Sequence, residues 1–482
     1  MDLQDFYMGA TFDAYDYFGA HLENGGVIFR TYAPNAQQIS IVGDFNKWKE
    51  QPLEQIHQSG VWMAFVPGAK PDQLYKYCIY GRNGRQEHCD PYGFGMELRP
   101  GACSIIRNLK NFHFSDKVWM QQRTRCYDKP LNIYELHLGS WKKSGEEWYT
   151  YDEIAAPLID HLKKHHFNYV EFMPLSEHPF DGSWGYQNTG FFAPSARYGT
   201  AAQLMQLIDM LHHADIGAIM DFVPVHFAVD SYGLREYDGT ALYEYPHKDV
   251  SESEWGSYNF NHSRPEVASF LQSAANYWLK EYHFDGLRMD AVSRLIYWQG
   301  DEKRGENGTT INFIKALNHG IHELHPTAML IAEDSTTYPG VTSETERNGL
   351  GFDYKWNLGW MHDMFDYFSC NAYDRPAMRE KLKFSMHYAY NERYILPLSH
   401  DEVVHGKKTI IDKLNGSYEE KFAQARTLYL YMMTHPGKKL NFMGNELAMF
   451  REWDEARELD WDLLQYPAHD AFLRYMTELG LV

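Results

Sequence analysis

The segment Phe284-Asp285-Gly286-Leu287-Arg288-Met289-Asp290-Ala291-Val292 places an arginine and a carboxylate where they would act together. It is typical of a short apolar strand that carries Arg288 and, two residues later, Asp290. Because side chains alternate along a strand, these two point to the same side. A neighbouring cation lowers the pKa of a carboxylate and keeps it ionised, as a nucleophile at neutral pH requires. For this segment alone, a surface ion pair at a strand end is the alternative interpretation.

Three further segments place acids or histidines at the end of a predicted strand. They are Asp221-Phe222-Val223-Pro224-Val225-His226, Ile331-Ala332-Glu333-Asp334 and Ser399-His400-Asp401-Glu402. Each has a structural alternative: a helix N-cap for Asp221, a satisfied core histidine for His226 or His400, and a helix-start carboxylate for Glu333. In a barrel of parallel strands, however, all C-terminal strand ends open onto one mouth. One shared site therefore explains the four segments better than four separate structural roles.

Strand-like and helical runs alternate after Phe112, which predicts a (β/α)₈ barrel. The eight candidate strands are Asn132–Leu138, Tyr169–Met173, Ala218–Val223, Gly286–Ala291, Ala328–Ala332, Phe352–Trp356, Tyr394–Leu398 and Lys439–Met443. Helical stretches such as Ala201–His213 and Pro265–Glu281 separate them. The barrel region is longer than the roughly 250 residues of a typical barrel, so loop insertions are expected. The longest gap predicts a polar, tyrosine-rich insertion at about 227–262.

The residues before the barrel predict a small all-β sandwich, because short β-rich runs alternate there with turn signals. The runs include Val27–Tyr32, Ile39–Val42, Val61–Val66 and Tyr75–Tyr80. The predicted organisation is a tail or leading helix at 1–17, the sandwich at 18–112, a linker at 113–131 and the barrel at 132–482.

Composition restricts the partners. The formal charge of −20 argues against binding a nucleic-acid backbone or an anionic membrane. Aromatic residues make up 16% of the chain, a surplus that suits the stacking of sugar rings. The five cysteines are an odd number without metal-site spacing, so reduced thiols in the cytoplasm are expected. The first residues show no signal-peptide pattern, and no apolar run approaches the ~20 residues of a membrane span.

Cleavage of a glycosidic bond requires two carboxyl groups that flank the bond. The four segments supply such carboxyl groups, with further acid, histidine and arginine residues nearby. A metal site built from the same histidines and aspartates is the competing interpretation. The sequence lacks the His-x-His and His-Glu-x-x-His spacings that would favour it. No nucleotide, flavin or pyridoxal signal is present either, and neither a metal nor a cofactor is expected.

At these segments the chain resembles the α-amylase family of glycoside hydrolases and transglycosylases, and within it the α-1,4-glucan branching enzymes. The four segments match the family's four signature regions. Longer motifs carry the closer likeness: Tyr134-Glu135-Leu136-His137-Leu138-Gly139-Ser140-Trp141, Glu177-His178-Pro179-Phe180-Asp181-Gly182-Ser183-Trp184-Gly185-Tyr186-Gln187, Lys355-Trp356-Asn357-Leu358-Gly359-Trp360-Met361-His362-Asp363 and Leu398-Ser399-His400-Asp401-Glu402-Val403-Val404-His405-Gly406-Lys407-Lys408. The likeness runs from about Gly26 to the end, and the sandwich is similar to the family's N-terminal glycogen-binding-like module.

The resemblance implies roles for the three acids. Asp290 would be the nucleophile that forms a β-linked glucosyl-enzyme, and Glu333 would be the acid and then the base. A raised pKa, favoured by the like charges of Asp290 and Asp401, would suit Glu333. Asp401 would bind hydroxyls of the distorted ring, and the two carboxyls would act by double displacement with retention, ~5 Å apart.

The resemblance also implies substrate-binding residues. Arg288 would hold Asp290 ionised, and Asp221 would brace Arg288. His226 and His400 would donate hydrogen bonds that strengthen in the transition state, and Tyr186 would stack on the sugar at the point of cleavage. These residues are Tyr186, Asp221, His226, Arg288 and His400.

The implied reaction cuts an α-1,4-glucan chain and rejoins it through a 6-hydroxyl, with glycogen, amylose or amylopectin as donor and acceptor. A debranching or trehalose-releasing hydrolase of the same family, and a catalytically weak glucan-binding protein, are the alternatives. Three positions depart from the family pattern. Val225 replaces an asparagine calcium ligand, Asp334 replaces a second glutamate, and the chain ends at Val482, where the family continues into a C-terminal β-sandwich.

Overall fold

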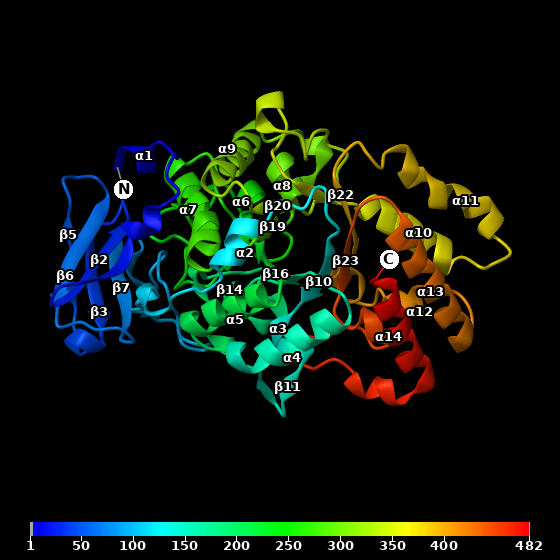
Figure 1. The fold of residues 1–482 in the computed structure, drawn as a ribbon. Helices are drawn as coiled ribbons and strands as arrows, with labels where there is room; N and C mark the ends of the chain where they lie inside the picture. Colours follow the sequence, from blue (N-terminus) through cyan, green and yellow to red (C-terminus); the bar gives the residue numbers. More distant parts are fainter. Residues whose placement is uncertain (1–2, 482) are drawn as a thin grey trace.

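The computed structural model describes residues 3–481. A small β-structure lies at one end of the molecule, a barrel occupies the middle, and the last helices lie at the far end (Figure 1). The short helix α1 (Leu3–Tyr7) falls in the predicted leading segment, whose residues 1 and 2 lie outside the described part. The buried ring of Phe6 anchors α1, and its carbonyl accepts a hydrogen bond from the Ser269 hydroxyl on a barrel helix.

Two antiparallel sheets form the N-terminal unit. One has the order β1-β2-β6-β5, and the other has the order β4-β3-β7-β8, with β9 paired to β7. Their bounds are β1 Gly19–Glu23, β2 Gly26–Tyr32, β3 Gln38–Gly43, β4 Gln51–Pro52, β5 Glu54–Gln55, β6 Val61–Pro67, β7 Leu74–Gly81, β8 Gly84–His88 and β9 Ser104–Ile105. Apolar side chains at alternate positions, such as Val27 and Phe29 or Ile39 and Ile41, are fully buried, as strand periodicity requires.

Eight parallel strands close into the barrel, in chain order β10-β13-β16-β19-β20-β21-β22-β23. Together with the N-terminal sheets, this confirms the predicted fold class. The strands are β10 Asn132–Leu136, β13 Tyr169–Phe172, β16 Gly217–Phe222, β19 Gly286–Met289, β20 Met329–Ala332, β21 Tyr354–Trp356, β22 Tyr394–Leu398 and β23 Lys438–Phe442. Each overlaps the strand predicted at its position.

Helices surround the barrel (Figure 1). Several begin with a side-chain cap: Thr150, Thr200 and Ser417 each bond the backbone three residues on in a capping box. The helices are α2 Lys117–Gln122, α3 Leu138–Trp141, α4 Tyr151–Lys164, α5 Ala201–His213, α6 Lys248–Ser251, α7 Pro265–Glu281, α8 Val292–Ile296, α9 Gly308–Leu324, α10 Leu358–Ser369, α11 Arg375–Phe384, α12 Ile410–Lys413, α13 Tyr418–Thr434 and α14 Pro467–Leu479. None of them is both long enough and apolar enough to cross a membrane.

The insertion after the third barrel strand packs against the N-terminal sheets. It begins with β17 (His226–Phe227), which pairs with β18 (Tyr258–Asn259) near its end. Between them, the buried Tyr237 hydroxyl lies 2.7 Å from the hydroxyl of Thr31 on β2. The insertion therefore connects the N-terminal unit to the barrel rim.

A buried charge network closes the opposite, N-terminal rim of the barrel. The Asp285 carboxylate accepts hydrogen bonds from Arg123 (3.1 Å), Trp119 (2.8 Å) and the backbone N–H of Ala218 (2.7 Å). It also lies 3.0 Å from Nε2 of His212. Burial alone would raise the pKa of Asp285, but His212 and Arg123 lower it below its usual value.

We expect Asp285→Asn to destabilise the protein by about 3–5 kcal/mol, because it leaves the buried Arg123 charge uncompensated. The contribution is present above the ordinary carboxyl pKa and is lost as pH falls. Thermal unfolding at pH 7 and at pH 3 measures it, and the loss should be smaller at pH 3, which lies below the ordinary carboxyl pKa. Asp16→Asn, which breaks an exposed pair with Lys280, is the control and should change stability by less than about 0.5 kcal/mol.

Candidate active site

The strand register brings the two predicted catalytic carboxyls to one rim. Strand β19 lies between β16 and β20, and Met289 pairs with Ala332. Asp290 and Glu333 follow these paired residues directly. Backbone bonds continue the ladder there: the N–H of Asp290 donates to the carbonyl of Phe222, and that of Glu333 to the carbonyl of Met289, both at 3.0 Å. Side chains 43 positions apart therefore leave neighbouring strands at the same level.

Arg288 is the centre of the charge network. Its side chain is fully buried, and Nη1 donates to both oxygens of Asp221 (2.8 and 2.9 Å) and to Oδ1 of Asp290 (2.8 Å). The guanidinium carbon lies 4.4 Å from the centre of the Trp356 ring and 5.9 Å from that of Tyr186. Ion pairs and ring faces together hold the cation below the two carboxylates.

Burial has the largest effect on the pKa of Asp290. Removal from water raises the pKa of this carboxyl, the Arg288 cation opposes the rise, and the Asp401 carboxylate adds to it. The net shift is upward. The expectation that Arg288 would leave Asp290 with a lowered pKa is therefore wrong: the arginine lowers it, but desolvation is the larger effect.

Glu333 has the pKa of a group that can both give and take a proton near neutrality. Burial raises its pKa to about 7, aided by the like charges of Asp290 and Asp401 and opposed by Arg288. One carboxylate oxygen accepts a hydrogen bond from the backbone N–H of Ala291 at 2.8 Å. Burial is thus the main cause of the raised pKa, and the like charges expected from sequence are the smaller one.

His400 is held in its charged form. Burial lowers its pKa, but Asp401 and Glu135 more than compensate and raise it to about 9. Nδ1 lies 2.5 Å from one Glu135 oxygen, and the backbone N–H of His400 donates to the other at 3.0 Å. Nε2 lies 3.5 Å from Asp401, whose side chain is half exposed in the cleft.

His226 is held neutral. It is buried beside Trp255, and burial together with the Arg294 cation lowers its pKa to about 3. Nδ1 has no hydrogen-bond partner among the described residues. The two predicted histidines therefore offer different chemistry: a charged donor at His400 and a neutral imidazole at His226.

These side chains open into one cleft of about 800 Å³. Asp290, Glu333, Asp401, His226, His400 and Tyr186 all line it, together with Trp184, Trp255 and Trp356. Asp221 and Arg288 lie beneath this surface, and the Tyr186 hydroxyl donates to Asp221. Asp334 turns away from the cleft and pairs with Lys355 at 2.8 Å, with its side chain fully buried.

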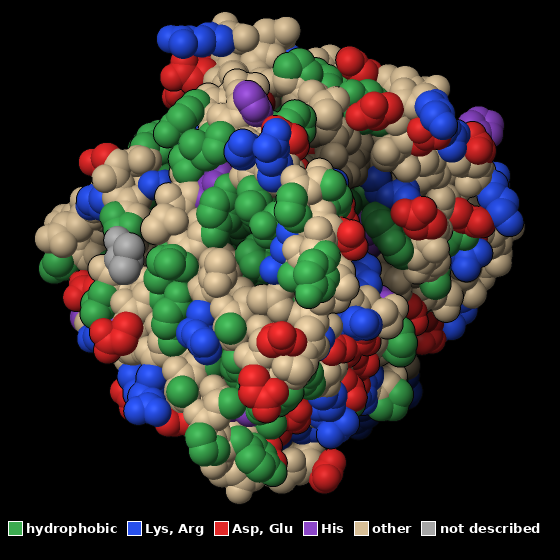
Figure 2. Space-filling model, turned by 90° about the vertical axis from the view of Figure 1, so that its right-hand side faces the viewer, with side chains coloured by type: hydrophobic (Ala, Val, Ile, Leu, Met, Phe, Trp, Pro, Cys, Tyr) green, Lys and Arg blue, Asp and Glu red, His purple; other side chains and the backbone are tan. Residues whose placement is uncertain are grey.

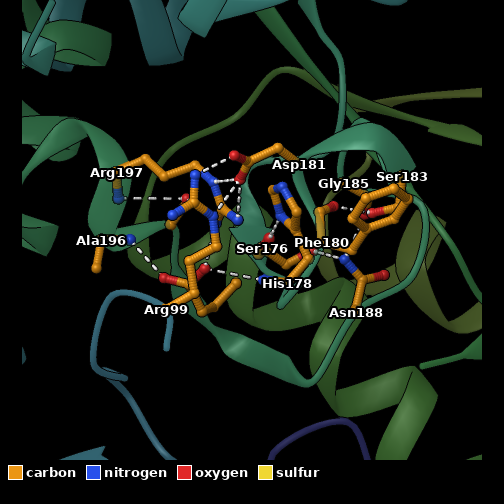
Figure 3. Close-up of polar contacts among 12 residues, drawn as sticks. Arg99, Ser176, His178, Phe180, Asp181, Ser183, Gly185, Asn188, Ala196 and Arg197 are labelled. Atoms are coloured by element: carbon orange, nitrogen blue, oxygen red, sulfur yellow. Dashed lines mark hydrogen bonds and ion pairs between the residues drawn. The ribbon is translucent and has the colours of Figure 1, made fainter. Parts of the chain in front are cut away.

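The loop that carries Tyr186 is fixed by two arginines. Figure 3 shows Arg99 and Arg197 converging on the carboxylate of Asp181. Arg197 also donates to Glu177 at 2.6 Å. The loop lies between the short strands β14 (Ser176–Glu177) and β15 (Gly190–Pro194).

Four side chains of this site have no role predicted from the sequence: Glu135, Glu171, Trp255 and Trp356. Glu135 and Trp356 lie in motifs that carry the family resemblance, and Trp255 lies in the predicted insertion. Glu171 on β13 pairs in register with Glu135 on β10. The sequence does contain a signal for Glu171, because it is an acidic residue inside a strand that the barrel buries on both faces. Within residues 3–481, no group of three or more His, Cys, Asp or Glu side chains is arranged to hold a metal ion.

Two family profiles match the chain. "Carbohydrate-binding module 48 (Isoamylase N-terminal domain)" matches residues 17–93, and "Alpha amylase, catalytic domain" matches residues 245–465. Among the most similar relatives is the 1,4-alpha-glucan branching enzyme GlgB of Bacillus caldolyticus, which is 46% identical over 98% of this chain and 73% of that protein. This chain belongs to the 1,4-alpha-glucan branching enzyme family.

Two other relatives of the same name support this membership. The protein of Fusobacterium nucleatum is 46% identical over 95% of this chain and 76% of its own length. That of Bacillus subtilis is 43% identical over 97% of this chain and 76% of its own length.

Solved structures agree on the fold. A pullulanase from Paenibacillus barengoltzii, in complex with maltohexaose and alpha-cyclodextrin, covers all of this chain and 82% of its own, with a TM-score of 0.76 and 20% identity. A pullulanase from Bacillus acidopullulyticus covers 97% of this chain and 64% of its own, with a TM-score of 0.75 and 19% identity. At these identities, the likeness concerns the fold alone.

The cross-strand acids Glu171 and Glu135 should respond differently to the same substitution. Burial raises the pKa of Glu171 well above its usual value, and neither carboxyl oxygen has a partner among the described residues. Glutamine has the shape of a neutral carboxylic acid, so we expect Glu171→Gln to change kcat/KM by less than about three-fold. Glu135→Gln removes the charged acceptor of His400 and should lower kcat/KM by roughly 10- to 100-fold. Equal losses in the two variants would show that Glu171 carries charge at neutral pH.

Proposed function

We propose that this protein is a retaining transglycosylase that cleaves α-1,4-glucan chains and transfers them to a 6-hydroxyl, forming α-1,6 branches. Family membership supports the reaction. The placement of Asp290 and Glu333 at one level of adjacent strands, facing one cleft, carries the assignment of residues. Glycogen, amylose or amylopectin serves as donor and acceptor.

In the first step, a carboxylate oxygen of Asp290 attacks the anomeric carbon and forms a β-linked glucosyl-enzyme. Glu333 enters protonated, as its pKa of about 7 permits, and gives its proton to the leaving 4-oxygen. Arg288, 2.8 Å from Asp290, stabilises the attacking carboxylate against its desolvation. The bond from the anomeric carbon to the leaving oxygen breaks as the bond to Asp290 forms.

In the second step, the 6-hydroxyl of an acceptor replaces the departed chain. Glu333, now a carboxylate, takes the hydroxyl proton, and the oxygen displaces Asp290 from the anomeric carbon. Two inversions retain the α configuration. Asp401, His400 and His226 hold sugar hydroxyls during both steps, while Tyr186 stacks on the ring at the point of cleavage.

We also propose the domain boundaries predicted from the sequence: a leading tail or helix at 1–17, a sandwich at 18–112 that binds glucan, a linker at 113–131 and the catalytic barrel at 132–482, with an insertion at about 227–262. The cytoplasm is the proposed location. Its support is that all five cysteines are free thiols, four of them buried.

Asp290→Asn should lower turnover by about 10³-fold or more, because amide nitrogen and oxygen do not form the glycosyl ester. Glucan binding should persist. Asp470→Asn, which removes an exposed partner of Arg474 on α14, is the matched control and should retain full activity. A scaffold without catalysis would show the same behaviour in both variants.

Product analysis separates transfer from hydrolysis. Amylose incubated with the protein should lose its iodine colour while debranchable α-1,6 linkages appear and reducing ends stay constant. Strong release of reducing ends without new branch points would instead assign the protein as a hydrolase, including a debranching or trehalose-releasing one.

The pH profile of kcat/KM should be bell-shaped, because the first step needs Glu333 protonated and Asp290 ionised. The alkaline limb should fall at about pH 7, the pKa of Glu333, with a tenfold loss per pH unit above it. The acid limb should lie above the ordinary aspartate value of about 4, since burial raises the pKa of Asp290. A rate constant that stays flat up to pH 9 would contradict Glu333 as the acid.

A further inference from the structure

A second cavity lies at the junction of the N-terminal sheets and the insertion, separate from the cleft. It has a volume of about 380 Å³. Arg82, from the turn between β7 and β8, forms one wall. Arg235 and Tyr258 of the insertion form another, and Arg264, which precedes α7, completes it. No residue that lines this cavity also lines the cleft. A volume of this size is in the range of small-molecule sites.

Three arginines of this cavity lack acidic partners. Among the described residues, no carboxylate lies within ion-pair distance of Arg82, Arg235 or Arg264. Arg235 instead lies over the ring of Tyr258, with its guanidinium carbon 5.3 Å from the ring centre. The chain has 65 acidic and 45 Lys and Arg residues, so acidic partners are abundant overall. Glu236, Glu244, Lys248 and Glu252 also line the cavity, and Lys248 pairs with Glu252. The three guanidiniums without an ion pair leave the lining with an excess of positive charge, which favours an anionic ligand.

The same cavity contains acceptors for hydroxyl groups. Glu244 is 3% exposed, and one of its oxygens accepts a hydrogen bond from the backbone N–H of Glu236 at 2.8 Å. The other oxygen is buried without a partner among the described residues. Burial raises the pKa of Glu244 to about 7, so this carboxyl group is only partly ionised at neutral pH. Lys248 and Glu252, also in the lining, pair with each other at 3.5 Å.

We propose that this cavity binds a phosphate monoester of a hexose. The phosphate accepts charge-assisted hydrogen bonds from Arg82, Arg235 and Arg264, for which the planar guanidinium fork is suited. Sugar hydroxyls donate hydrogen bonds to the free oxygen of Glu244. A neutral sugar would leave the arginines unpaired, and inorganic phosphate would leave Glu244 unpaired.

The insertion links this cavity to the active site. Glu252 lines the cavity, while Glu254 and Trp255, two and three residues later, line the cleft. A ligand that bridges Arg82 of the N-terminal unit to Arg264 of the barrel would also tie these two units together. The ligand site itself rests on the cavity alone and does not depend on the proposed reaction.

Isothermal titration of the whole protein with glucose 6-phosphate tests the proposal, with glucose and inorganic phosphate titrated in parallel. Glucose 6-phosphate should bind at one site, at least ten-fold more tightly than either fragment. The Asp290→Asn protein should give the same constant, so a failure of the proposed reaction would leave this result unchanged. Equal affinity for inorganic phosphate would indicate an adventitious anion site, and no binding of glucose 6-phosphate would overturn the proposal.

Two variants assign the binding to this cavity. Arg235→Gln and Arg264→Gln should each weaken binding by roughly 10- to 100-fold, the effect of one lost charge-assisted hydrogen bond. Arg379→Gln on the exposed face of α11 is the matched control and should bind as the wild type does. Circular dichroism checks that each variant is folded. Unchanged affinity in both folded variants would place the ligand elsewhere and contradict the proposal.

A free hexose phosphate and a phosphorylated glucosyl unit within a glucan present the same chemical group. Titration with a phosphorylated dextrin, before and after phosphatase treatment, distinguishes these sources. Tight binding that Arg235→Gln removes and that phosphatase abolishes would identify the glucan-borne group as a ligand. If the dextrin does not bind while glucose 6-phosphate does, the free sugar phosphate is the ligand.

Discussion

The active site depends on the cost of burying the charge of Arg288. A guanidinium inside a barrel is tolerated only where carboxylates compensate it, and Asp221 supplies both of its oxygens to Nη1. This interaction joins the ends of β16 and β19 and fixes the height of the arginine. Asp290 then receives a single hydrogen bond from the same nitrogen. The Asp290 carboxylate is thereby oriented without being fully neutralised.

The same desolvation acts in opposite directions on acids and bases. It raises the pKa of Glu333 and Asp290 and lowers that of His226, while the carboxylates around His400 reverse the effect there. One barrel rim therefore holds a carboxyl group with a pKa near neutrality, a second buried carboxyl group, a neutral imidazole and an imidazolium. Burial and the neighbouring charges together account for the charge state of each of these groups.

Elements far from the barrel strands position the substrate-facing surface. Arg99, from the segment that follows the N-terminal sheets, bonds Asp181 and so restrains the loop that presents Tyr186 (Figure 3). The insertion contributes Trp255 to the cleft, where its carbonyl accepts a hydrogen bond from Gln187 of that loop at 2.9 Å. On the face shown in Figure 2, acidic, basic and hydrophobic side chains are interspersed, and no continuous basic surface is visible there. This suits a neutral, hydroxyl-rich polymer better than a polyanion.

Sequence by itself determined the eight strands, because each is an apolar run whose length and turn-rich borders are local properties. It also determined that acids stand at four strand ends, and the barrel rule then predicts that they share a rim. It did not determine that burial outweighs Arg288 at Asp290, that Asp334 turns toward Lys355, or that Glu135 holds His400 across 265 positions. Those outcomes depend on how much water each side chain loses and on neighbours from other strands. Both are properties of the closed barrel, and only the tertiary structure decided them.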